Sequence, residues 1–292
     1  MADNSATAYT RRWCGNGEIA FLALSSGTRL RYLKVGGGPS LLLLHTLRTQ
    51  LDYFQRLIPK LTSHFMVYAV DLPGLGWSDI SAGASYEEPA VRSAVIEFVE
   101  KLDLRDLTLA GESIGATVSL TSAAVLGPRL RHVVALNSYD YPQGLERANL
   151  LASIVVKAMR IPVLGLVPSK LENALILRGV MRGGFFDPSR LPEDFLAEQL
   201  RSGKRPGYAH VECGYFRGLP SYIAARGLYP RVKVPVTLIY GDHDWSKPQE
   251  RDEVAQLVPG SRKITLMRSG HFGSLEHPDE IATTLIDAAR RR

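Results

Sequence analysis

The chain of 292 residues has only two cysteines, Cys14 and Cys213, which form at most one disulfide. This scarcity argues against a secreted framework held by several disulfides. No apolar run approaches the roughly 18 residues of a membrane span, and residues 1–5 lack the basic start and apolar core of a signal peptide. We therefore predict a protein with no membrane span, in a reducing, cytoplasmic setting.

The chain has no long run of acidic or basic residues. Lys plus Arg exceed Asp plus Glu by six, 35 against 29, and the only tight basic run is residues 290–292, which we expect at the end of the last helix. No Gly-x-Gly-x-x-Gly loop follows a strand, and the histidines and cysteines are too dispersed for a metal site. We predict no nucleic-acid partner, no cofactor and no metal. The oligomeric state stays open.

What the chain does have is an alternation of strand-like and helix-like segments. Residues 41–44 and 66–70 are unbroken apolar runs, typical of strands covered on both faces. Residues 52–61 and 88–102 have helical apolar spacing, and residues 19–35 resemble an antiparallel hairpin. With 45% hydrophobic residues the chain can bury a large core. The alternation predicts an α/β fold with a mostly parallel sheet.

The alternation lapses between residues 139 and 230, a stretch too long for an unstructured loop. Helical spacing at 150–159, 171–181 and 192–200 predicts a small helical insertion there. We expect it to act as a cap, with the core formed by 1–138 and 231–292. Its aromatic and methionine side chains either line an apolar substrate cavity or pack the cap onto the core. Substrate choice would then reside in the cap and the chemistry in the core.

The most informative segment is Gly111-Glu112-Ser113-Ile114-Gly115, which follows an apolar run and begins an amphipathic one. The glycines flank Ser113 at two residues on each side, where a Cβ would collide with backbone if the serine occupied a strained turn. Such a turn exposes the serine hydroxyl. It also directs the free N–H groups at the start of the next helix toward whatever the serine attacks.

This segment resembles the nucleophile elbow of the α/β-hydrolase family. Residues 71–79 are similar to the family's loop after the fourth strand, residues 241–244 to its acid loop, and residues 269–272 to its histidine loop. The order serine, aspartate, histidine is also the order of that family. The resemblance implies a mostly parallel eight-stranded sheet flanked by helices, with an inserted helical cap.

The resemblance also implies a catalytic triad of Ser113, Asp244 and His271. A serine hydroxyl needs a base within hydrogen-bond reach and a third group that orients the base, and His271 and Asp244 match those positions. Asp242 is the nearest rival of Asp244. Each of these residues, taken alone, could equally be an ordinary loop residue.

The oxyanion hole implied by the resemblance consists of the N–H groups of Ile114 and Leu47. Here the sequence departs from the family, because relatives usually have glycine where this chain has Thr46. A β-branched residue resists a positive φ, so either the loop adopts another conformation or the Thr46 hydroxyl enters the site. We expect a structural role for His45, with contact to substrate as the alternative.

The sequence thus predicts a cofactor-independent, carboxylesterase-like serine hydrolase. It would cleave an ester, thioester, lactone or activated C–C bond of a mainly apolar small molecule through an acyl-enzyme. The alternative is a non-hydrolytic enzyme of the same fold, a lyase or cofactor-free oxygenase, in which His271 and Asp244 transfer protons. A binding protein that retains the fold is a third interpretation.

Overall fold

The computed structural model describes residues 5–161 and 165–290. The predictions about the N-terminal segment and the basic tail fall largely outside these residues. The described chain forms one sheet in the order β1-β2-β4-β3-β5-β6-β7-β8. The strands are β1 (Glu18–Ala23), β2 (Arg29–Gly36), β3 (Ser40–Leu44), β4 (Met66–Val70), β5 (Leu107–Glu112), β6 (Leu130–Leu136), β7 (Val236–Gly241) and β8 (Arg262–Leu266).

β2 is antiparallel to both of its neighbours, β1 and β4, and the remaining pairs are parallel. The predicted fold class and the edge hairpin are therefore confirmed. β3 lies between β4 and β5, and residues 41–44 are buried. Helices cover both faces of this central strand, which explains its run of leucines without polar alternation.

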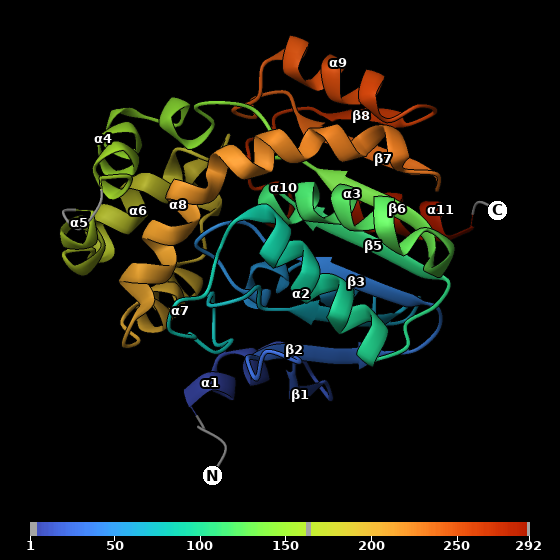
Figure 1. Ribbon diagram of the computed structural model, residues 1–292, viewed down its shortest axis with the longest axis horizontal. Helices are drawn as coiled ribbons and strands as arrows, with labels where there is room; N and C mark the ends of the chain where they lie inside the picture. Colours follow the sequence, from blue (N-terminus) through green and yellow to red (C-terminus); the bar gives the residue numbers. More distant parts are fainter. Residues whose placement is uncertain (1–4, 162–164, 291–292) are drawn as a thin grey trace.

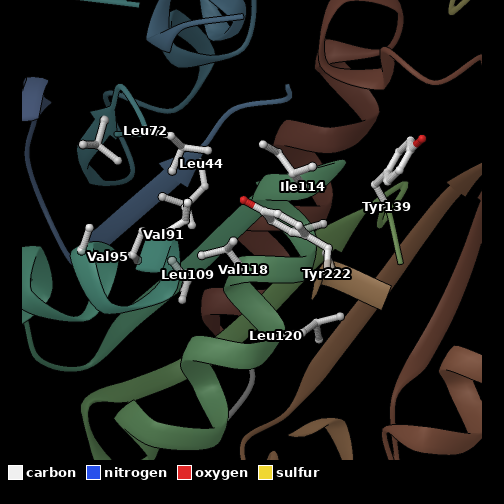
Figure 2. Close-up of a cluster of buried hydrophobic side chains, with 14 of the residues drawn as sticks. Leu44, Leu72, Val91, Val95, Leu109, Ile114, Val118, Leu120, Tyr139 and Tyr222 are labelled. Carbon is white, nitrogen blue, oxygen red and sulfur yellow. The ribbon is translucent and has the colours of Figure 1, made fainter. Parts of the chain in front are cut away.

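Helices cover the two faces of the sheet (Figure 1). On one face lie α2 (Glu88–Lys101), α3 (Ile114–Leu126) and α9 (Pro248–Leu257), and on the other lie α10 (Gly273–Glu276) and α11 (Pro278–Arg290). Figure 2 shows the apolar core between the sheet and the first group of helices, which includes Leu44, Leu109, Val91, Val95, Val118 and Leu120.

Between β6 and β7 the insertion (residues 139–230) forms helices that gather at one end of the sheet (Figure 1). They are α4 (Leu150–Met159), α5 (Leu166–Lys170), α6 (Ala174–Arg182), α7 (Glu193–Gly203) and α8 (Tyr208–Ala224). Helices were predicted near α4, α6 and α7, whereas α5 and α8 were not predicted. α8 extends beyond the other inserted helices and contacts α2 and α3.

The remaining helical segments are short. They are α1 (Ser5–Ala8) and the 3-10 helices Thr10–Arg12, Leu51–Phe54, Ile58–Lys60, Gly127–Arg129, Leu145–Arg147, Pro188–Arg190 and Ala225–Arg231. The single helix predicted at 52–61 is wrong, because the structure has two 3-10 helices there. Pro59 lies in the second of them and lacks the N–H that a continuous α-helix would need.

Cys14 and Cys213 are both free and buried. Within residues 5–161 and 165–290, no helix has the length and apolarity needed to cross a membrane.

Candidate active site

Ser113 lies in a sharp turn between the end of β5 and the start of α3. Its φ of 60° and ψ of −122° are strained for a residue with a side chain. The flanking glycines permit the turn: a Cβ on Gly111 would lie 2.2 Å from the Gly115 carbonyl oxygen, and one on Gly115 2.2 Å from the Leu44 carbonyl oxygen. The backbone around Ser113 is therefore packed as closely as the two glycines of the motif predicted.

The structure brings Ser113, His271 and Asp244 into one hydrogen-bonded chain. His271 Nε2 lies 2.9 Å from Ser113 Oγ, and His271 Nδ1 lies 2.5 Å from Asp244 Oδ1. All three residues are buried. Burial raises the pKa of Asp244, but the nearby His271 and hydrogen bonds from His271 and Ser246 outweigh it, so the pKa is lowered overall. Asp244 is therefore an ionised acceptor for the Nδ1–H of His271.

Asp242, the rival acid, points elsewhere. Its Oδ1 lies 2.8 Å from His243 Nδ1 and accepts a hydrogen bond of 3.0 Å from the Ser269 N–H. Although its slight burial raises the pKa, these hydrogen bonds lower it to about 2. Asp242 thus joins the acid loop to the histidine loop without contacting the His271 ring.

Two residues that the sequence analysis did not single out hold His271 in place. The indole of Trp245 stacks on the imidazole with ring centroids 3.8 Å apart and an angle of 13° between the planes. Asn137 Nδ2 donates a 3.0 Å hydrogen bond to the His271 carbonyl oxygen, and the His271 N–H donates to Gly184 of the insertion at 2.7 Å. The feature of the sequence that pointed to Trp245 is its position directly after Asp244.

Glu112, directly before Ser113, fixes the turn that follows His271. Its carboxylate accepts hydrogen bonds from the Gly273 N–H at 2.6 Å and from the Ser274 hydroxyl at 2.5 Å. Complete burial raises the pKa of Glu112 to about 7, even though these hydrogen bonds and His271 oppose the shift. A residue from the strand of the serine thus supports the loop of the histidine.

The loop after β3 adopts a conformation that removes the predicted strain at Thr46. The positive φ falls on Arg48, at 64°, and not on Thr46. The Thr46 hydroxyl lies 3.2 Å from Thr49 Oγ1 and 3.3 Å from the Leu47 carbonyl oxygen. The loop is therefore changed, as the first alternative predicted. Thr46 also lines the cavity beside Ser113, and a role of its hydroxyl in the site stays a prediction.

His45 is engaged within the core. Its Nε2 accepts a 2.9 Å hydrogen bond from the Leu72 N–H, and its Nδ1 lies 2.8 Å from the Thr46 carbonyl oxygen. Burial lowers the pKa of His45 to about 4. The ring is therefore neutral at pH 7, and it joins the β3 and β4 loops.

Two backbone N–H groups border the serine. In the part of the chain that the structure describes, neither the Ile114 N–H nor the Leu47 N–H donates a hydrogen bond to another residue. Ile114 begins α3, where the N–H groups lack helical partners. Leu47 lies in the loop after β3 and lines the same cavity as Ser113. Both groups are free to bind an anion.

A narrow cavity opens between Ser113 and the inserted helices. The centre of a water molecule can occupy about 50 Å³ of it, enough for a few non-hydrogen atoms without rearrangement. On the core side it is lined by Thr46, Leu47, Arg48, Ser113, Trp245, His271 and Phe272, and on the insertion side mainly by Leu145, Val155, Val156, Met159, Ile176, Leu177, Val180, Met181 and Phe216.

The walls contributed by the insertion are almost entirely apolar, and Glu172 and Glu212 are the exceptions. Of the aromatic and methionine residues singled out in the sequence, Met159, Met181 and Phe216 line the cavity. The others, Phe185, Phe186, Tyr208, Tyr215 and Tyr222, do not line it. Among the described residues, no group of three or more His, Cys, Asp or Glu side chains could hold a metal ion.

Comparison with known proteins shows the family of this chain. A model of the alpha/beta hydrolase family matches residues 41–284. Pimeloyl-acyl-carrier-protein methyl ester esterase of Aeromonas hydrophila is 24% identical over 248 residues, which are 85% of this chain and 94% of that protein. Haloalkane dehalogenase 2 of Mycobacterium tuberculosis is 26% identical over 275 residues, covering 90% and 92%.

Among solved structures, the epoxide hydrolase CorEH has a TM-score of 0.81 at 19% identity, covering 93% of this chain and 98% of that one. The chain belongs to the alpha/beta hydrolase family, as its four motifs indicated. The two relatives named above are, by name, an esterase and a dehalogenase.

Proposed function

We propose that this protein is a cofactor-independent serine hydrolase in which Ser113 is the nucleophile, His271 the general base and Asp244 the residue that orients the base. The observation that carries the proposal is the chain of hydrogen bonds from Ser113 Oγ through His271 to Asp244, buried beneath an apolar cavity. A buried, correctly oriented imidazole is what converts a weak hydroxyl into a nucleophile.

In the first half-reaction, Ser113 Oγ attacks the substrate carbonyl carbon while His271 Nε2 takes the hydroxyl proton. The resulting oxyanion is held by the N–H groups of Ile114 and Leu47. His271 then protonates the leaving group, and the bond to that group breaks, which leaves an acyl-enzyme on Ser113. In the second half-reaction, the oxygen of a water molecule attacks the acyl carbon while His271 Nε2 takes one of its protons. The bond between that carbon and Ser113 Oγ then breaks as His271 returns the proton to Oγ, which releases the acid and free Ser113.

The lining and volume of the cavity support a substrate class. Its walls from α4 and α6 are apolar, and its volume admits only a slim group without movement of the inserted helices. We propose a mainly apolar small molecule with an ester, thioester, lactone or activated C–C bond, and residues 139–230 as the cap that selects it. The relationship to a methyl ester esterase supports the ester as the first bond to test. The free cysteines agree with the cytoplasmic setting that we infer.

A second candidate is a proton-transfer enzyme of the same fold, a lyase or cofactor-free oxygenase. It is favoured by the unusual loop after β3, in which the positive φ has moved to Arg48. In that case His271 and Asp244 would act directly on the substrate, and Ser113 would form no covalent bond.

Reaction with a fluorophosphonate probe separates the two candidates, because stable phosphonylation requires an activated serine. We expect one adduct per chain, mapped to the peptide that contains Ser113, and no adduct in Ser113→Ala. Failure of the folded parent protein to react, or an adduct on a different residue, would contradict the proposed function.

A further inference from the structure

Arg48 is a buried arginine next to Leu47, and its side chain extends from the core into the insertion. Its Nη1 donates to the Gln199 carbonyl oxygen at 3.3 Å and lies 3.2 Å from the Tyr208 hydroxyl. Its Nε lies 2.8 Å from Glu212 Oε1, and its Nη2 pairs with Glu172. The guanidinium thus contacts α7, α8 and the segment before α6.

The backbone of Arg48 is held by the same helices. Gln199 Nε2 donates a 3.2 Å hydrogen bond to the Arg48 carbonyl oxygen. A Cβ on Gly203 would lie 2.5 Å from Arg48 Nη2, so a side chain at this position would displace the guanidinium from its present contacts. Gln50, two residues further on, also contacts α7 through a 3.3 Å hydrogen bond to Glu198.

These contacts hold the backbone next to Leu47, whose N–H is one of the two proposed oxyanion donors. Arg48 has a φ of 64°, which a residue with a side chain adopts only when its surroundings hold it there. Leu47, the adjacent residue, has a free N–H and lines the cavity beside Ser113. The Leu47 N–H lies in the peptide between Thr46 and Leu47, whose carbonyl oxygen is held by His45 Nδ1 and Thr49. The contacts of Arg48 hold the next peptide, between Leu47 and Arg48, and so restrict rotation of Leu47 and of its N–H.

We propose that Arg48 is a positioning residue that couples the insertion to the oxyanion hole. Its contacts with Gln199, Glu172 and Glu212 hold the loop after β3 in the conformation that presents the Leu47 N–H to the oxyanion. The docked helices thus add to the contacts that His45 and Thr49 make with the Thr46 carbonyl oxygen in holding the donor in place. This inference rests on the proposed function, since it assigns a task to one of the two N–H groups of that mechanism.

The structure offers a matched control in Arg205. This partly buried arginine also joins the insertion to the core, but its guanidinium donates to the carbonyl oxygens of Ser78 and Gly74, at 2.8 and 2.7 Å, in the loop after β4. Its loss removes a comparable contact between insertion and core without touching the loop of Leu47.

The test compares Arg48→Met, Arg48→Lys and Arg205→Met by the rate of fluorophosphonate labelling and by kcat and KM for a small acetate ester. A small ester is used because it has few atoms that can contact the inserted helices, so changes in substrate binding contribute little to the measured rates. Loss of an oxyanion donor costs about 10²–10³ in turnover, and a displaced donor retains part of this, so we expect Arg48→Met to lower kcat and the labelling rate at least about tenfold. KM should change little. Arg48→Lys, which retains the charge, should recover part of the rate, and Arg205→Met should stay within about threefold of the parent.

Removal of Arg48 alone leaves the buried carboxylate of Glu212 and the largely buried carboxylate of Glu172 without their cation, which destabilises the protein. The variant Arg48→Met/Glu172→Gln/Glu212→Gln removes all three charges together. If Arg48 positions the loop, this neutral variant regains stability but keeps the low kcat. Parental kcat in the folded neutral variant would mean that Arg48 only neutralises the two glutamates, and the inference would be overturned.

The same data separate this inference from the proposed function. If the parent protein is labelled at Ser113 and Arg48→Met is labelled equally fast, the coupling is absent while the serine hydrolase stands. If Arg205→Met slows labelling as much as Arg48→Met, loss of any contact between the insertion and the core slows the reaction. Arg48 would then not specifically position the loop after β3. If the parent itself is not labelled, the proposed function fails, and the inference fails with it.

Discussion

The two loops that meet at Ser113 are supported in different ways. The loop of His271 is held mainly by the core, through Glu112 at the end of β5 and Asn137 after β6, with two hydrogen bonds from its backbone to the Gly184 carbonyl oxygen. The loop after β3 is held at its start by His45, and beyond Leu47 by the contacts of Arg48 with the inserted helices. We therefore infer that the second oxyanion donor depends more on the insertion than the groups that activate the serine do.

Replacement of Ser113 gives the largest effect. Alanine fits the same turn and removes no core volume, so Ser113→Ala should keep the parental unfolding transition and lose turnover by about 10⁴-fold or more. Hydrolysis of a nitrophenyl ester measures the change. Turnover within about tenfold of the parent would remove Ser113 from the mechanism.

The next effect tests which acid supports His271. Asparagine preserves the shape of aspartate and removes its charge, so Asp244→Asn should reduce turnover about 10⁴-fold by favouring the wrong imidazole tautomer. Asp242→Asn is the matched control, because Asp242 does not touch the ring. We expect a much smaller loss for it, and the assignment is wrong if Asp242→Asn proves the more damaging.

Replacement of Glu112 tests how the loop of His271 is supported, through the pH dependence of the free energy of unfolding. The pKa of Glu112 is about 7 in the folded protein and about 4.5 in an unfolded chain, so between these values the folded state binds more protons. The free energy of unfolding therefore falls as the pH rises through this range. Glutamine does not titrate, so Glu112→Gln removes this dependence of the free energy of unfolding on pH. The free energy of unfolding of the variant minus that of the parent should therefore rise by about 1–3 kcal/mol between pH 4.5 and 8. Urea denaturation at several pH values measures it, and a difference that does not change with pH would contradict the assignment.

The smallest effect is expected at Thr46. Its hydroxyl already has partners within the loop, Thr49 Oγ1 and the Leu47 carbonyl oxygen. Thr46→Val keeps the shape, so turnover should fall only about two- to fivefold through loosening of the loop. A loss of 10² or more would show that the hydroxyl itself donates to the oxyanion.

The core and its site could largely be predicted from the sequence because their signals are local. Unbroken apolar runs mark buried parallel strands, and the glycines around Ser113 mark a turn that only small residues permit. Asp244 and His271 follow strands, so the fold brings them to the same edge of the sheet. The helix predicted at 52–61 was wrong because helical spacing alone does not distinguish an α-helix from two 3-10 turns around Pro59.

The dependence of the site on the insertion could not be predicted. Arg48 and Gln199 are 151 positions apart, and no local pattern links them. The sequence predicted a separation of chemistry in the core from selection in the cap, but Arg48 and Gly184 join the two in the structure. The sequence also did not predict which residue of the loop after β3 has a positive φ. The departure from the family is at Thr46, whereas the residue with a positive φ is Arg48.

The central claim is that Ser113 forms a covalent acyl-enzyme. A nitrophenyl carbamate tests it most directly, since a carbamyl-enzyme hydrolyses slowly and can be isolated. The account predicts a burst of one nitrophenolate per chain, together with a mass increase equal to the carbamyl group minus one hydrogen on the peptide that contains Ser113. Release of nitrophenolate over many turnovers with no modified chain, or a carbamyl group on any residue other than Ser113, would contradict it.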